Sequence, residues 1–279
     1  MKRKFSSLLA SAGVAAFLLG SVPALAQVAP VLGTAAPYAV LGRNAIPIPG
    51  TVTCTGPGTI NGQVGTTFAL GITNVPACAI TGPIVSPVPA GVTADFDAAF
   101  AAIDALNPVC SGGVIPPASA VIAPGVYCTP AGHTLVGPGI TYTLNGTASD
   151  VWVFRVGTGG PGALSLTNVN VVMGGTAQPC NVYWKTSAAA TITDTNFVGT
   201  ILSGTAVTMT RGSWTGRGMA TTDITLTDPA PMTFAGCAAP AGAGGNIPTL
   251  SEWAMIVLGG LLALFGFVAV RRRARVSLN

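Results

Sequence analysis

The chain has 279 residues, of which only 7% are charged, with 37 glycines, 22 prolines and a formal net charge of +4. The positive charge belongs to the two ends, because residues 27–246 carry five basic side chains against seven acidic ones. The body therefore has no basic stripe that would bind nucleic acid, and its β-branched runs argue against a disordered chain.

The first 26 residues have the pattern of an export signal. A basic start at 2–4 is followed by an apolar stretch from 8 to 19, and Ala24-Leu25-Ala26 provides the small-x-small cleavage pattern. We expect a signal peptide over 1–26 and a mature chain that begins at Gln27. A retained membrane helix is the alternative.

The mature chain is predicted to be mainly β. Residues 28–90 are rich in Gly, Pro and Thr, and runs such as Tyr38-Ala39-Val40-Leu41 predict short strands broken by turns. Strands are expected again from 125–127 onward, and the strongest strand signals are at 151–156 and 181–186.

One α-helix is expected between these strand regions. Thr93 is placed to cap it and Asn107-Pro108 to end it, while the aspartates at 95, 97 and 104 are expected on a solvated face. Apolar side chains recur at helical spacing as one stripe: Phe96, Phe100, Ile103 and Leu106. We expect this stripe to pack against the side of the β structure.

Six cysteines lie in the exported part: Cys54, Cys78, Cys110, Cys128, Cys180 and Cys237. An even set in an oxidising compartment predicts disulfides, although the connectivity stays open. We favour sequence neighbours, 54 with 78 and 110 with 128, which leaves 180 with 237. A zinc site is the alternative, but no pair has C-x-x-C spacing and His133 is the sole histidine, so no metal is expected.

A threonine repeat with a period of 17 residues is the most informative feature of the body. Its members are Thr191, Thr193, Thr208, Thr210, Thr225 and Thr227, with Phe197 matching Trp214, Gly199 matching Gly216 and Leu202 matching Met219. A short fixed period in alternating segments is typical of a stacked β-solenoid. Because a strand alternates sides, Ile192, Met209 and Leu226 should point inward and the threonines outward, as a flat grid.

The C-terminal part has three segments in a fixed order. A Gly/Ala/Pro linker at 238–246 is followed by a short motif, then by 18 uncharged residues at 253–270 and a tail with four arginines. The motif contains Ile247, Pro248, Thr249, Leu250 and Trp253. The uncharged stretch is just long enough to span a bilayer, and its basic tail should stay in the cytoplasm.

Residues 247–279 resemble an IPTL-type C-terminal sorting signal of Gram-negative bacteria. The resemblance implies recognition by an exosortase-like enzyme, cleavage near the motif, transient anchoring in the inner membrane, and delivery to the cell surface or outside the cell. A plain single-pass anchor is the alternative.

Residues 31–234 resemble the microbial ice-binding protein family. The similarity rests on Leu32-Gly33-Thr34-Ala35, Pro124-Gly125-Val126-Tyr127 and, above all, the segment from 180 to 220. It implies an irregular right-handed β-solenoid over 27–237 with one helix packed alongside, whose N-terminal and C-terminal coils stack out of sequence order. Members bind ice through one flat face, without metal or cofactor.

The sequence therefore favours an exported ice-binding protein that uses its six repeat threonines and is not an enzyme. A cell-surface adhesin or matrix protein on the same scaffold is the alternative, because threonine ladders also stabilise strands. His133 has no nucleophile motif near it, no Gly-rich phosphate loop precedes a helix, and no carboxylate pair is recognisable.

Overall fold

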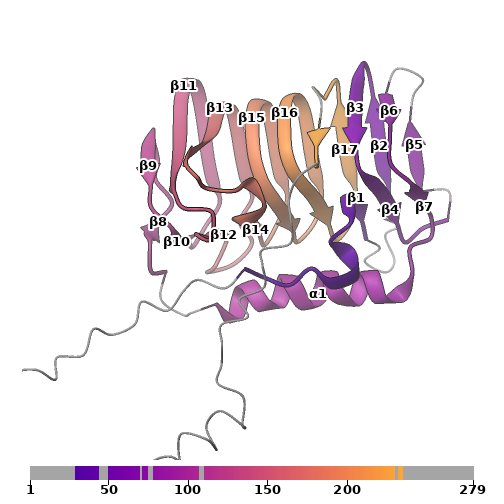
Figure 1. The fold of residues 1–279 in the computed structure, drawn as a ribbon, viewed down its shortest axis with the longest axis horizontal. Coiled ribbons are helices and arrows are strands. Elements are labelled where there is room, and N and C mark those ends of the chain that lie inside the picture. Colours follow the sequence, from indigo (N-terminus) through magenta and orange to yellow (C-terminus); the bar gives the residue numbers. More distant parts are fainter. Residues whose placement is uncertain are drawn as a thin grey trace, which may run out of the picture.

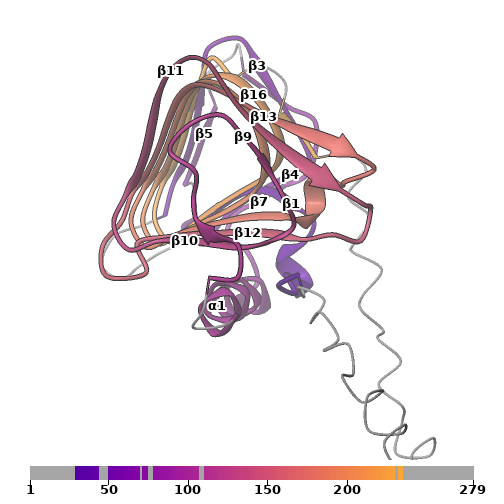
Figure 2. The ribbon, with the colours of Figure 1, turned by 90° about the vertical axis from the view of Figure 1, so that its left-hand side faces the viewer.

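The computed structural model describes residues 29–43, 50–69, 71–74, 78–106, 110–229 and 232–234. Its 18 strands join in one sheet that winds into a three-sided prism, with a single α-helix along one side (Figure 1, Figure 2). Neighbouring strands pair in parallel, which is the arrangement of a β-solenoid.

We name the three sides faces A, B and C, in the order in which each coil visits them. Face A contains β8 (Gly113–Val114), β10 (Gly125–Thr129), β12 (Trp152–Val156), β14 (Val182–Thr186), the ends of β15 (Ala190–Ser203) and β16 (Val207–Ala220), β1 (Tyr38–Gly42), β4 (Gln63–Thr66) and β7 (Ile84–Val85). Face B contains the starts of β11 (His133–Gly146), β13 (Leu164–Gly175), β15 and β16, then β17 (Ile224–Thr227), β2 (Val52–Thr55) and β5 (Ile72–Asn74). Face C contains β9 (Ala120–Ile122), the ends of β11 and β13, the middles of β15 and β16, then β18 (Met232–Thr233), β3 (Gly58–Asn61) and β6 (Cys78–Ile80).

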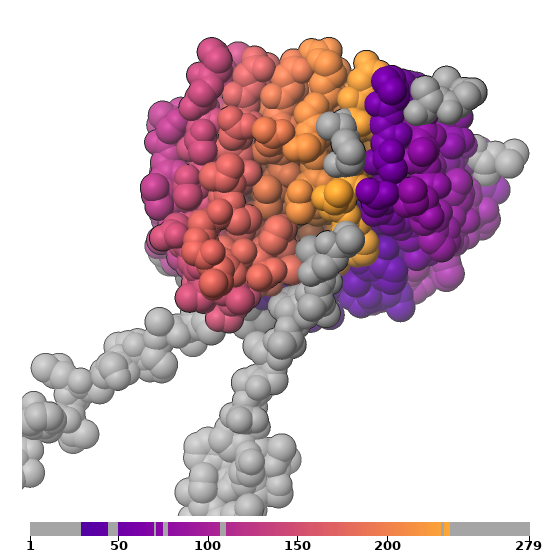
Figure 3. All heavy atoms as spheres, turned by 45° about the horizontal axis from the view of Figure 1, so that its top comes forward, coloured from indigo at the N-terminus to yellow at the C-terminus, as the bar shows by residue number. Residues whose placement is uncertain are grey.

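The family resemblance implied that the coils stack out of sequence order, and the structure has this arrangement. The last C-terminal strand on face B, β17, pairs with β2 from the start of the chain, in the register Ile224 with Val52. Figure 3 shows the same junction, with the yellow C-terminal coil lying directly against the indigo N-terminal coils. The two ends of the described chain thus complete one continuous solenoid.

The helix α1 (Ala90–Ala105) connects the two ends of this solenoid. It follows β7 at one end and leads to β8 at the other, running beneath face A (Figure 1, Figure 2). Its buried side chains are Val92, Phe96, Ala99 and Ile103, which pack on the outward side chains of face A. The predicted stripe was right for Phe96 and Ile103, whereas Phe100 and Leu106 lie at its margin and are only partly buried.

The predicted N-cap was wrong. The helix begins about one turn earlier, with Pro89 in the capping position, and the Thr93 hydroxyl donates a hydrogen bond to the Ala90 carbonyl oxygen, 2.8 Å away. The earlier start is favoured because it brings Val92, which is only 4% exposed, into the layer between helix and sheet.

The helix aspartates are also not a simple solvated face. Asp97 forms an ion pair with Arg43 at 2.6 Å, and Asp104 contacts both Lys185 and Arg155 on face A. Asp95 accepts hydrogen bonds from the backbone N–H and the hydroxyl of Thr34, at 2.7 and 2.6 Å. These partners come from distant parts of the chain, so helical spacing alone could not show them.

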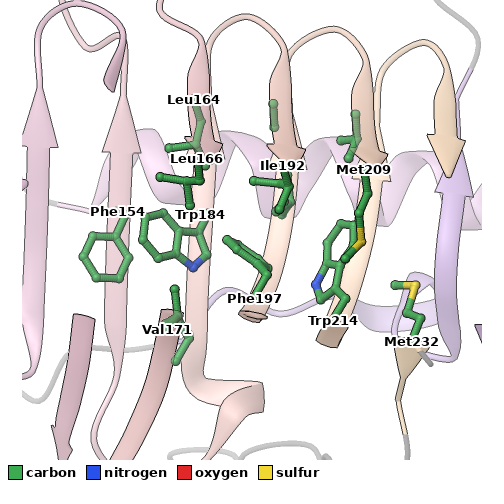
Figure 4. Packing of buried hydrophobic residues seen from close by; sticks show 14 of the residues in the cluster. Phe154, Leu164, Leu166, Val171, Trp184, Ile192, Phe197, Met209, Trp214 and Met232 are labelled. Atoms are coloured by element: carbon green, nitrogen blue, oxygen red, sulfur yellow. The ribbon is translucent and has the colours of Figure 1, made fainter. Parts of the chain in front are cut away.

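An aromatic row fills the interior of the prism (Figure 4). Phe154 stacks on Trp184 with ring centroids 3.9 Å apart, and Phe197 lies 5.4 Å from Trp184 on one side and from Trp214 on the other. The inward aliphatic side chains of face B pack above this row, among them Leu166, Ile192 and Met209. Each coil therefore adds one layer to a continuous core.

Two disulfides join the expected sequence neighbours, Cys54 with Cys78 and Cys110 with Cys128. Cys180 is buried, and its proposed partner Cys237 lies outside the described residues.

The predicted signal peptide, linker, sorting motif and membrane span at 253–270 lie outside the described residues as well. Within the part of the chain that the structure describes, no helix has the length and apolar character needed to cross a membrane.

Candidate functional site

Face B carries two parallel columns of outward side chains, most of them threonine. The six repeat threonines occupy three adjacent strands in perfect register, with Thr191 beside Thr208 and Thr208 beside Thr225. The side chains between them, Ile192 and Leu226, are fully buried, so the threonines point outward as predicted.

The columns extend well beyond the six predicted residues. The first column consists of Thr134, Ser165, Thr191, Thr208, Thr225, Thr53 and Thr73, and the second of Thr167, Thr193, Thr210, Thr227 and Thr55, with Val136 at its end. We call these twelve hydroxyl-bearing residues the threonine grid. With strands about 4.8 Å apart and alternate residues about 6.7 Å apart, its seven rungs cover roughly 29 by 7 Å.

Partial signals for the missed members of the grid are present in the sequence. Thr53-Cys54-Thr55 repeats the Thr-x-Thr pattern but falls outside the period of 17, because the N-terminal coil joins the stack out of order. Ser165-Leu166-Thr167 carries the pattern with serine in one place, and a longer coil separates it from the next rung.

The grid hydroxyls are not used inside the protein. Among the described residues, no grid hydroxyl forms a hydrogen bond to another protein group, and each grid residue is half-buried or exposed. A hydroxyl can both donate and accept, so the whole grid is available to bound water.

The other two faces differ from face B. On face C, the Asn196 amide donates to the Asn170 side-chain oxygen at 2.8 Å, and the Ser213 hydroxyl donates to the Asn196 side-chain oxygen at 2.8 Å. Face A is covered by α1 (Figure 2). Of the three sides described, face B alone combines a regular hydroxyl array with free hydrogen-bonding capacity.

Two charged residues beside the grid form an ion pair at the corner between faces B and C. Asp194 and Arg211 follow the second column directly and have φ values of 49° and 56°, in the left-handed region where the chain turns. The Arg211 guanidinium donates two hydrogen bonds of 2.6 Å to the Asp194 carboxylate, and these hydrogen bonds lower the pKa of Asp194. The pair thus borders the grid as a neutralised unit.

The sole histidine belongs to the core. His133 is 7% exposed, and its Nε2 atom lies 3.0 Å from the Tyr142 hydroxyl oxygen. Burial lowers the pKa of His133 and raises that of Tyr142. In the described ranges, no three His, Cys, Asp or Glu side chains are grouped so that they could hold a metal ion.

A model of the ice-binding-like family matches residues 49–230, which include most of the solenoid and the whole threonine grid. The chain belongs to the ice-binding-like family. A model of the IPTL-CTERM motif matches residues 247–273, in agreement with the second resemblance drawn from the sequence.

Individual relatives point the same way. An ice-binding protein of Flavobacterium frigoris is 40% identical over 87 residues, a match that covers 30% of each chain. Ice-binding protein K3-B1 of Typhula ishikariensis is 30% identical over 225 residues, covering 73% of this chain and 87% of the relative. A solved domain of a Shewanella frigidimarina ice-binding protein is 26% identical and superimposes with a TM-score of 0.64, covering 75% of this chain and 99% of that domain. These relatives give no support to the adhesin alternative.

Proposed function

We propose that this chain binds ice crystals through the threonine grid, without catalysis and without a cofactor. The observation that carries the proposal is the grid itself, in which twelve hydroxyl-bearing side chains stand in two columns over seven strands in continuous register. Membership of the ice-binding-like family supports it independently.

The physical reason lies in how ice differs from liquid water. The two differ in the regularity of their oxygens, so a protein can distinguish them only with a rigid, flat and repetitive surface. The threonine side chain suits this task because its hydroxyl binds ordered water and its β-branch restricts χ1, so little side-chain entropy is lost on binding. Each contact is weak, and affinity comes from many contacts on a surface that is already organised.

The scaffold provides that rigidity. Below the grid, the inward residues Ile192, Met209 and Leu226 are completely buried, and the aromatic row lies behind them (Figure 4). Close packing leaves these strands little room to shift relative to one another. Apart from the break that marks the corner after Val136, the strand pairs on face B keep one uninterrupted register.

We further propose that the chain is exported and sorted to the cell surface or the medium. Residues 1–26 would direct export, the linker at 238–246 would separate the solenoid from the membrane, and the segment 253–270 would anchor it transiently. An exosortase-like enzyme would recognise the sorting motif Ile247, Pro248, Thr249, Leu250 and Trp253. The match to the IPTL-CTERM motif supports this step. Pulse-chase labelling of the full chain should show a shortened surface product, and L250A should slow its appearance.

Thermal hysteresis and inhibition of ice recrystallisation test the ice-binding proposal. The solved Shewanella domain is 99% covered by this chain, so residues 27–246 are a reasonable unit to purify. In this unit, T208Y places a bulky ring in the centre of the grid and should cause a roughly fivefold or greater loss of both activities.

A matched variant controls for the substitution itself. Thr143 lies on face C between Val121 and Val172, which are 73% and 39% exposed, so this surface can accept a tyrosine. T143Y should retain the parent activity, and both variants should keep the parent circular dichroism spectrum. An inactive parent, or equal activity in T208Y and T143Y, would refute ice binding through the grid.

A further inference from the structure

The Cys54–Cys78 disulfide lies directly beneath the N-terminal end of the grid. Cys54 is the inward residue between Thr53 and Thr55 and is 1% exposed. Its partner Cys78 is 2% exposed and belongs to β6 on face C, in the next coil. The bond therefore lies in the interior of the prism and ties β2 to the last coil of the solenoid.

One of the two apolar columns that support the grid from the inside ends at this point. In the inward column between the two threonine columns, Leu166, Ile192, Met209 and Leu226 are all fully buried, and the next two residues are Cys54 and Asn74. The other inward column continues through the buried Ile224 and Val52 and ends at the half-buried Ile72. Asn74 is exposed, and its amide reaches the Cys78 carbonyl oxygen only at 3.5 Å. Apolar packing beneath the final rung is thus reduced to the half-buried Ile72.

The strands at this end are also short. β5 has only three residues, of which Ile72 is half-buried and Thr73 and Asn74 are exposed. On face B it is the last strand that the structure describes, so it has a paired neighbour on one side only. A short edge strand with little apolar burial opens locally at a low free-energy cost.

We propose that the Cys54–Cys78 disulfide positions the last two rungs of the grid, on β2 and β5, in the plane of the central threonines. The covalent bond restricts the movement of these two strands, as apolar packing restricts the movement of the central strands. This inference rests on the proposed ice-binding function, and it assigns the two cysteines to the ice-binding surface as positioning residues.

The second disulfide provides a matched control. Cys110–Cys128 closes a loop of similar length, 18 residues against 24, so its effect on the entropy of the unfolded chain should be nearly the same. Cys128, however, lies on face A in the layer between the sheet and α1, away from the grid. A purely general stabilisation should therefore be lost equally from both double variants.

The experiment compares C54A/C78A with C110A/C128A in residues 27–246, near 0 °C, where both are expected to be folded. We expect C54A/C78A to lose thermal hysteresis roughly twofold or more and C110A/C128A to retain it. Amide hydrogen exchange should accelerate at residues 52–55 and 72–74 in the first variant only. Should C54A/C78A fail to fold, C54V/C78V replaces the sulfur atoms with apolar volume and serves in its place.

Each outcome of this experiment either supports or overturns the positioning role of the Cys54–Cys78 disulfide. Full hysteresis in the Cys54–Cys78 variant, or equal losses in both variants, would overturn the positioning role while leaving ice binding intact. Unchanged exchange at 52–55 would also overturn it. If the parent itself lacks hysteresis, the ice-binding proposal fails, and the exchange rates alone then decide whether the disulfide holds these strands.

Discussion

Thr227 and Thr55 lie side by side on adjacent strands, although 172 residues separate them in the chain. Their pairing, with that of Thr225 and Thr53, joins the C-terminal part of the grid to its N-terminal part. The surface that we assign to ice is thus assembled from both ends of the domain, and its size depends on this junction.

The junction gives the first prediction. T53Y should reduce thermal hysteresis roughly as strongly as T208Y, because both place a ring within the same array. Thr59 provides the control, since it lies on face C of the same coil, beside the exposed Ala79. If T53Y keeps the parent hysteresis while T208Y loses it, the grid is limited to the three repeat strands.

The corner pair gives the second prediction. Because Asp194 and Arg211 neutralise each other at the edge of the grid, the double variant D194N/R211Q should retain hysteresis within about twofold of the parent. T210R, which introduces an unpaired charge within the second column, should abolish most of it. A strong loss in D194N/R211Q would show that the corner itself contacts ice.

His133 gives a prediction about pH. Burial lowers the pKa of His133 below its ordinary value of 6.5, so the unfolded chain binds a proton more readily than the folded one. The contribution to stability is therefore complete above pH 6.5 and is lost as the pH falls through the lowered pKa of the folded state. The melting temperature of residues 27–246 should drop between about pH 7 and pH 5.

H133L should remove that dependence, because it is the sole histidine and the next strand carries Leu164 at the paired position. The expected result is a melting temperature that is flat over this range. A parent protein whose melting temperature does not change between these pH values would contradict a buried imidazole with a lowered pKa.

The aromatic row gives a prediction about stability. Phe197 is 1% exposed and contacts both Trp184 and Trp214, so F197A should lower the free energy of unfolding by about 3–5 kcal/mol. F197L preserves more of the volume and should cost less. Urea denaturation measures both, and a loss below about 1 kcal/mol in F197A would show that the row is dispensable.

Much of the fold could be read from the sequence because the central coils repeat locally. The period of 17 fixed the register of β15, β16 and β17, including Phe197 opposite Trp214. The prediction that the N-terminal and C-terminal coils stack together rested on the family resemblance, because no local sequence pattern encodes a contact between the two ends of the chain.

The candidate site was predicted only in its central half for the same reason. Thr53 and Thr55 have the right pattern, but their place in the columns depends on the out-of-order stacking. The partners of the helix aspartates were likewise hidden, because Arg43, Arg155 and Lys185 reach α1 only once the solenoid has formed.

The most direct test of the account is the partitioning of fluorescently labelled residues 27–246 into a slowly growing ice hemisphere. We predict that the parent domain is incorporated into the ice, while T208Y is left in the liquid. Exclusion of the parent domain from the ice, or equal incorporation of both proteins, would contradict the assignment of the threonine grid as an ice-binding surface.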